Sequence, residues 1–258
     1  KENSQTLAAL GLTDKVKASF SLDTKAFQLS VYKKDLDHLN NVAQGEGTLE
    51  GAVYGLFKEN EKVSEATTDQ EGKAVFRDLE LGNYILKEIR PSNGYELDSK
   101  EYPILIDENT SLELTKEVYE KVIENEIEII KVYTEDGAGI LPIEKQIQFS
   151  IYDGNENLVK TLVTDHTGMI KCKLPYGTYK VVQDTTTPGY DKVKDFFITV
   201  SEQKTEPVRY VLSDLLTRAK VKIKKVDEEG NAIKKAGISF KIKNKETQEY
   251  IKQTISYP

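Results

Sequence analysis

The sequence predicts an all-β protein built from tandem antiparallel β-sandwiches. Apolar and polar residues alternate with a period of two in many short stretches that are rich in Tyr, Val, Ile and Thr and end at Gly, Asn or Asp. This pattern is typical of half-buried strands. A helical period is weak at residues 6–18, and LTKEVYEKVIEN at residues 114–125 fits helix and strand equally well. The pattern as a whole favours sheets packed face to face.

An internal repeat divides the chain into domains. Residues 67–95 and 163–190 align in register, and both contain a D-x-x-G turn, a Gly-x-Tyr and a closing Gly-Tyr. A strand that ends in Lys and an acidic turn begins near Phe27, Ile127 and Val221, so the unit has roughly a hundred residues. We expect domains at 25–126 and 127–218, and a truncated third at 219–258. Residues 1–24 are expected to be a leader or the tail of a preceding unit.

Composition excludes several classes of function. The 258 residues are 38% hydrophobic and contain no long apolar run, so we expect no membrane span. The net charge is -7 and Arg is scarce, which argues against a nucleic-acid partner. With one cysteine, Cys172, and two histidines, His38 and His166, neither a disulfide nor a metal site is expected, and no cofactor.

The strand alternation places charged residues on apolar faces. Lys33 shares a face with Phe27, Leu29 and Val31, and Lys131 and Lys225 end apolar faces in the same way. A single such Lys is explained by its head reaching solvent at a strand end, but the same register occurs three times.

A carboxyl group and an amide are expected in the same core. Glu88 shares the face of Tyr84, and Asn125 shares that of Ile123. Burial favours a neutral Lys amine and a protonated Glu, because ionised groups are costly away from water. A neutral amine can attack an amide carbonyl that a carboxylic acid polarises, which would join Lys33 to Asn125 with loss of ammonia.

The units resemble the Cna protein B-type, or SpaA-like, domains of Gram-positive surface adhesins and pilins. The resemblance covers about residues 27–257 and is carried by the I-x-I-x-K strand, GAVYGLF at 51–57, the D-x-x-G turn, and Y-x-x-x-E followed by P-x-x-G-Y. It implies a transthyretin-like or inverse-immunoglobulin sandwich with a spontaneous isopeptide bond between its first and last strands. Lys33 takes the place of the nucleophile, Asn125 that of the acceptor and Glu88 that of the catalytic acid.

The second unit departs from this family pattern. Lys131 and Asp214 match the nucleophile and the acceptor, but Gln183 stands where the acid is expected. Because an amide cannot shuttle a proton as an acid does, we expect no second bond, or a slow one, and one cross-link in total. Lys225 opens the third unit, whose acid and acceptor lie beyond residue 258, so we expect it to stay unpaired.

These features favour a structural function. We expect a stalk segment of an extracellular, cell-wall-attached surface protein or pilin, with neighbouring repeat domains of the same chain as partners. It is not expected to be an enzyme beyond forming its own bond. An adhesin module that binds a host matrix ligand is the alternative, and host extracellular matrix stays open as a partner of other regions. A glycoside hydrolase has little support, and Cys172 fits a packed strand residue better than a thioester site.

Overall fold

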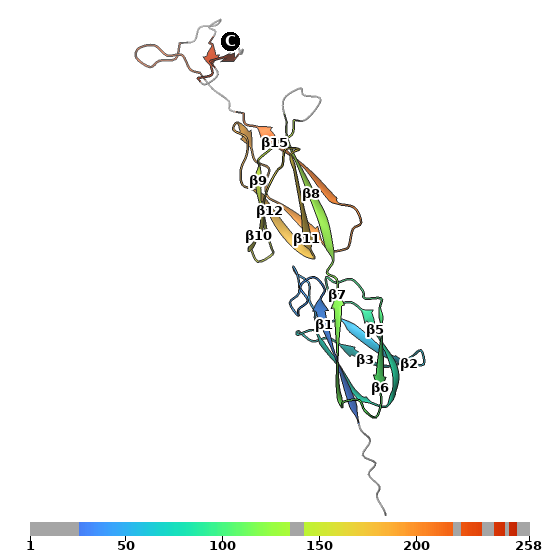
Figure 1. The fold of residues 1–258 in the computed structure, drawn as a ribbon. Helices are drawn as coiled ribbons and strands as arrows, with labels where there is room; N and C mark the ends of the chain where they lie inside the picture. The colour runs from blue at the N-terminus through green and yellow to red at the C-terminus, as the bar shows by residue number, and fades with distance from the viewer. Residues whose placement is uncertain (1–25, 135–141, 219–222, 234–239, 246–247, 252–258) are drawn as a thin grey trace, which may run out of the picture. The chain divides into compact units, whose positions relative to one another are not determined.

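The computed structural model describes residues 26–134, 142–218, 223–233, 240–245 and 248–251, and the described residues contain strands but no helix (Figure 1). None of the described segments is therefore a helix that could cross a membrane. The predicted all-β class is confirmed. Residues 1–24 lie outside the described part of the chain.

The first sandwich packs a three-stranded sheet against a four-stranded sheet. Their orders are β4-β1-β7 and β3-β2-β5-β6. The strands are β1 (Phe27–Asp35), β2 (Val53–Lys58), β3 (Glu61–Thr67), β4 (Lys73–Leu79), β5 (Gly82–Arg90), β6 (Glu101–Ile106) and β7 (Glu113–Glu120).

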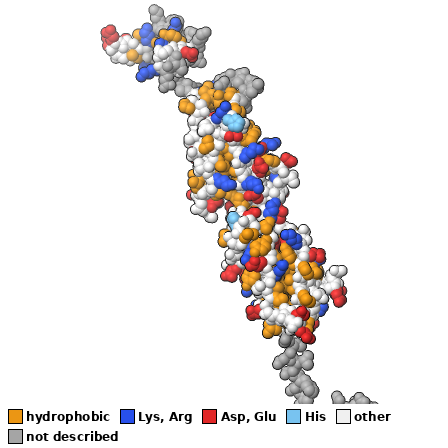
Figure 2. Space-filling view, in the orientation of Figure 1, with side chains coloured by type: hydrophobic (Ala, Val, Ile, Leu, Met, Phe, Trp, Pro, Cys, Tyr) orange, Lys and Arg blue, Asp and Glu red, His pale blue; other side chains and the backbone are white. Residues whose placement is uncertain are grey.

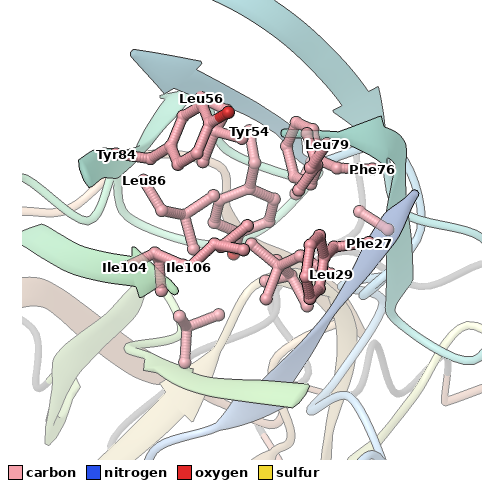
Figure 3. Close-up of a cluster of buried hydrophobic side chains, with 14 residues drawn as sticks. Phe27, Leu29, Tyr54, Leu56, Phe76, Leu79, Tyr84, Leu86, Ile104 and Ile106 are labelled. Carbon is pink, nitrogen blue, oxygen red and sulfur yellow. The ribbon is translucent and has the colours of Figure 1, made fainter. Parts of the chain in front are cut away.

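The core of this sandwich follows the predicted alternation. Phe27, Leu29 and Val31 of β1 are buried, as are Tyr54 and Leu86 from the opposite sheet. Figure 3 shows the labelled side chains from the two sheets meeting in one cluster. The inward faces of β1 and β5 therefore lie where the sequence places them.

The second sandwich consists of two four-stranded sheets, ordered β11-β8-β15-β13 and β10-β9-β12-β14. Its strands are β8 (Glu124–Thr134), β9 (Gln148–Tyr152), β10 (Leu158–Val163), β11 (Met169–Pro175), β12 (Gly177–Gln183), β13 (Tyr190–Asp191), β14 (Phe196–Val200) and β15 (Val208–Leu216). Its core includes Ile127, Ile129, Phe149 and Tyr179. Because β8 begins at Glu124, the expected boundary between residues 126 and 127 falls inside a strand.

Each sandwich contains one parallel strand pair, between its first and last strands. Strand β1 pairs with β7, and β8 pairs with β15, whereas the other ladders of both sandwiches are antiparallel. Parallel neighbours need a long connection, and here the rest of the domain provides it. The pairing brings Lys33 opposite Val118 and Lys131 opposite Leu212. The first and last strands of each domain therefore lie side by side, and the chain enters at one end of the pair and leaves at the other.

The repeated D-x-x-G turns support the lysine-bearing strands. Gly72 and Gly168 have φ values of 76° and 73°, a region that glycine enters without steric cost. Their carbonyl oxygens accept the N–H groups of Lys33 and Lys131, both at 2.8 Å. The turn thus fixes the backbone of each lysine.

A separate unit comprises residues 217–258. Its described part contains β16 (Ile242–Lys243) and β17 (Tyr250–Ile251), which form a hairpin. Lys225 is exposed here.

On the face drawn in Figure 2, acidic and basic side chains lie among one another rather than in one area of a single charge.

Candidate cross-linking sites

A buried lysine on the first strand of the first sandwich contacts a carboxyl group at the end of the last strand. Lys33 of β1 is in direct contact, through Nζ, with Oε2 of Glu120 at the end of β7. Its Nζ also lies 3.5 Å from Oε1 of Glu88 on β5. All three side chains have 0% exposure, so one amine and two carboxyl groups share a site closed to solvent.

Neighbouring groups orient both carboxyls. The backbone N–H of Asp98 donates to Oε2 of Glu88 at 2.7 Å, which leaves Oε1 facing the amine. The buried hydroxyl of Tyr54 donates to Oε1 of Glu120. The ring of Tyr95 covers Lys33 Nζ at 4.8 Å from its centroid. The site is therefore held rigidly from both sheets.

Burial shifts the titration of this site toward neutral forms. It lowers the pKa of Lys33 to about 8, although Glu88 opposes the shift. It raises the pKa of Glu88, although Lys33 opposes that shift. Burial also raises the pKa of Tyr54, so its hydroxyl keeps the proton that it donates. A free amine is a nucleophile and a neutral carboxylic acid is a proton donor, so both forms suit amide formation.

Asn125, the expected acceptor, lies elsewhere. It belongs to β8 of the second sandwich, where its Nδ2 donates to the carbonyl of Glu202 at 3.0 Å and its Oδ1 accepts from the N–H of Lys204 at 2.8 Å. Strand β7 ends at Glu120, five residues before Asn125, and β8 begins at Glu124. Glu120 occupies the position beside Lys33 that we had expected Asn125 to fill.

The second sandwich has a corresponding site around Lys131. Its Nζ lies 2.8 Å from Oδ1 of Asp214 on β15 and 2.8 Å from Oε2 of Glu144. The side chains are 0%, 0% and 1% exposed, respectively. The structure thus brings Lys131 and Asp214 together as expected, and adds a carboxyl group that the sequence pattern did not indicate.

Gln183 also lies in this site, but its side chain donates to Asp214 rather than contacting the amine of Lys131. Its Nε2 donates to Oδ2 of Asp214 at 2.7 Å, and the hydroxyl of Thr186 donates to the same oxygen at 2.7 Å. Burial alone raises the pKa of Asp214, but hydrogen bonds from Lys131, Gln183 and Thr186 outweigh it and hold that pKa below its usual value.

Asp35 anchors the residue that covers the first site. Its buried carboxylate accepts hydrogen bonds from the Tyr95 hydroxyl at 2.8 Å, the His38 N–H at 2.8 Å and the Gln44 side chain at 3.0 Å. Burial by itself would raise the pKa of Asp35, but these hydrogen bonds have the larger combined effect. The pKa of Asp35 is therefore held below its usual value.

We expect Asp35→Asn to lower the free energy of unfolding near pH 7 by about 2 kcal/mol, because hydrogen bonds to a charge are lost. A depressed folded pKa stabilises the fold above the unfolded value of about 3.9, and the effect fades as pH falls through the folded pKa. Guanidinium unfolding of both proteins should therefore show a difference near neutral pH that shrinks in acid. A difference that stays constant down to strong acid would contradict this role.

Other candidate groups have no comparable setting. Among the described residues, no group of three or more His, Cys, Asp or Glu side chains is placed to hold a metal ion. Cys172 lies on β11 opposite Ile127 and packs against the second core. Burial raises the pKa of its thiol, which disfavours the reactive thiolate.

Comparisons with known proteins agree with this architecture. The model of the SpaA family, a prealbumin-like fold domain, matches residues 27–119 and 125–212. A collagen adhesin of Staphylococcus aureus is 27% identical over 199 residues, which cover 69% of this chain and 17% of the adhesin.

Two solved structures share the fold. The Bacillus anthracis TIE protein has a TM-score of 0.60 and 27% identity, over 88% of this chain and 40% of that one. A C-terminal fragment of the pilus adhesin SpaC from Lactobacillus rhamnosus GG has a TM-score of 0.50 and 13% identity, over 76% of this chain and 100% of the fragment. The chain spans less than two thirds of the length of the adhesin and of the TIE protein. With two family matches over most of its length, it belongs to the SpaA family of prealbumin-like domains found in Gram-positive surface proteins.

Proposed function

We propose that this chain is a stalk segment of a cell-wall-attached surface protein or pilin, in which an amide between Lys33 and Glu120 locks the first sandwich. The observation that carries the proposal is the solvent-free contact of Lys33 with Glu120, which joins the first and last strands beside the carboxyl group of Glu88. Glu120 replaces Asn125 as acceptor in this proposal because Asn125 contacts other residues.

The reaction needs no reagent from outside the site. The free amine of Lys33 attacks the carboxyl carbon of protonated Glu120, and the C–N bond forms as one C–O bond breaks. Glu88 accepts a proton from the amine and gives one to the departing oxygen, which leaves as water. The Tyr54 hydroxyl donates to the other oxygen of Glu120, where negative charge develops during the attack. One amide and one water result, and Glu88 is regenerated.

The position of the bond explains its use in a stalk. Tension that enters at the start of β1 would cross to the end of β7 through the amide, so residues 34–119 would carry no load. The cross-link also closes a loop of about 90 residues and, treated like a disulfide, restricts the unfolded chain by roughly 4 to 5 kcal/mol. A disulfide cannot do this here, because the chain has one cysteine.

Peptide mapping after proteolysis tests the bond. We expect a branched peptide that joins Lys33 to Glu120 in the wild type, and two separate peptides in Glu88→Gln, which keeps the side-chain shape but removes the acid. Glu117→Gln is the matched control, because Glu117 lies on β7 as Glu120 does but pairs with Lys34 at the surface. A branched peptide that persists in Glu88→Gln would show that Glu88 is not the catalyst, and its absence from the wild type would refute the bond.

A direct adhesin function is the second candidate, favoured by the similarity to a collagen adhesin. We expect the chain to show no saturable binding to immobilised collagen in a surface-plasmon-resonance titration, because the stalk function needs no ligand. Saturable binding that is removed by surface substitutions would overturn the pure stalk function and leave the cross-link untouched.

A further inference from the structure

Glu144 is a buried carboxyl group beside Lys131, and the Lys33 site of the first sandwich has no carboxyl group at the equivalent position. Its backbone is fixed at both ends: its N–H donates to the Lys131 carbonyl at 2.9 Å, and its carbonyl accepts from the Thr164 hydroxyl at 3.0 Å. The N–H of Thr187 donates to its Oε1 at 2.9 Å, so that Oε2 faces Lys131 Nζ. Glu88 is held in the same way, with one oxygen on a backbone N–H and the other toward the amine.

The position equivalent to Glu144 in the first sandwich is occupied by a leucine. In each sandwich a buried threonine hydroxyl both accepts and donates a hydrogen bond. It accepts one from a backbone N–H and donates one to the backbone carbonyl three residues earlier in the chain. Thr68 donates to Leu49 and Thr164 donates to Glu144. Leu49 is 3% exposed and packs in an apolar cluster.

At the position of Glu88 the difference is reversed, because the first sandwich has the carboxyl group there and the second has the amide of Gln183. Glu88 pairs with Tyr54 across β5 and β2, and Gln183 pairs with Phe149 across β12 and β9. The first sandwich therefore has leucine before its second strand and the acid on its central strand, whereas the second has the acid before β9 and an amide on the central strand. Each site keeps one amine and two carboxyl groups.

We propose that Glu144 is the catalytic acid of the second sandwich and that Lys131 and Asp214 become joined by an amide. This inference rests on the proposed cross-linking function and extends it to a second site with a different source of the acid.

The chemistry balances within the site. Lys131 Nζ bonds to the side-chain carboxyl carbon of Asp214, and one oxygen of that carboxyl leaves as water. Glu144 touches Nζ, so it can take the proton that the amine loses and return one to the departing oxygen. Gln183 and Thr186 both donate to Oδ2 of Asp214, where charge develops as the amine attacks. Gln183 thus supplies a hydrogen bond to the acceptor, as Tyr54 does in the first site, rather than a proton for transfer.

Peptide mapping of the whole chain tests this assignment. We expect a second branched peptide, Lys131 joined to Asp214, in the wild type and in the surface control Glu156→Gln. In Glu144→Gln we expect this peptide to disappear while the Lys33–Glu120 peptide remains. The first site is thus an internal reference, since its loss in the wild type would refute the proposed function without bearing on Glu144.

An exchange variant guards against simple misfolding. Glu144→Leu alone should abolish the second bond, and Glu144→Leu combined with Gln183→Glu should restore it, because the pair reproduces the arrangement of the first sandwich. A wild type without the Lys131–Asp214 peptide would overturn the proposal. So would a Glu144→Gln or Glu144→Leu protein that still forms it.

Discussion

Pulled from its two ends, the first sandwich of the wild-type protein is expected to release only the few residues of β1 that precede Lys33. The amide would carry the force from Lys33 to Glu120, so the sheets between them stay folded. In Glu88→Gln the same pull should unfold the domain and add about 90 residues of extended chain, or about 300 Å of contour length. Single-molecule force spectroscopy measures this difference directly.

The parallel pairing of β1 and β7 makes this contrast large. Without the cross-link, only the hydrogen-bond ladder between β1 and β7 and the packing of the sheets resist the applied force. Glu117→Gln, which keeps the bond, should behave as the wild type does. A wild-type first sandwich that extends by the full length of Glu88→Gln would contradict a covalent link between these strands.

Removing the amine of the second site should destabilise that sandwich severely. In Lys131→Met, the carboxyl groups of Glu144 and Asp214 stay in the core without the lysine nitrogen that contacts both of them. A buried charge left without its partner typically costs on the order of 3 to 5 kcal/mol. Loss of the proposed bond would add roughly 4 to 5 kcal/mol for a closed loop of about 80 residues. Guanidinium unfolding followed by circular dichroism should show the second sandwich unfolding at a much lower concentration.

Two further variants separate charge from packing. Lys180→Met removes a lysine that pairs with Asp195 at the surface of the same sandwich, and should change little. Lys131→Met combined with Glu144→Leu and Asp214→Leu also removes the two carboxyl groups that would otherwise be buried without a partner. This triple variant should recover part of the lost free energy of unfolding, because apolar replacement of a whole buried ionic group is often tolerated. If Lys131→Met were as stable as Lys180→Met, the ion contacts in the core would not be structural.

The inward-facing lysines could be predicted because period-two alternation is a local property of a strand. Lys33 and Lys131 each follow apolar residues at alternate positions, and burial of these residues confirms the faces. Glu88 was predicted in the same way, from its spacing to Tyr84. These residues lie within regular strands, where sequence spacing determines which side of the sheet a side chain occupies.

The contact of Glu120 with Lys33, on which the proposed bond depends, could not be predicted because residues 114–125 fit helix and strand alike. In the structure β7 ends at Glu120, two residues after the buried Val118, just as Asp214 follows Leu212. Aligning these two strand ends would have identified it. Placing the end of the first domain at residue 126 instead assigned Asn125 to the wrong sandwich, since β8 already begins at Glu124.

Glu144 could not be predicted from alternation. It precedes β9 and lies three residues before Ile147, which is the opposite phase from the inward-facing residues of that strand. Its position depends on contacts distant in sequence, namely the carbonyl of Lys131 and the hydroxyl of Thr164. Only the folded chain shows that a carboxyl group reaches the site in which Gln183 stands in place of an acid.

The most direct test is the intact mass of the denatured wild-type chain. We expect a mass below that of the sequence by two waters, one for Lys33–Glu120 and one for Lys131–Asp214. A deficit of one water would mean that only one of the two bonds forms, which peptide mapping would identify, and a deficit of one ammonia would restore an asparagine as acceptor. The full sequence mass would show that neither buried lysine is joined to the last strand of its sandwich.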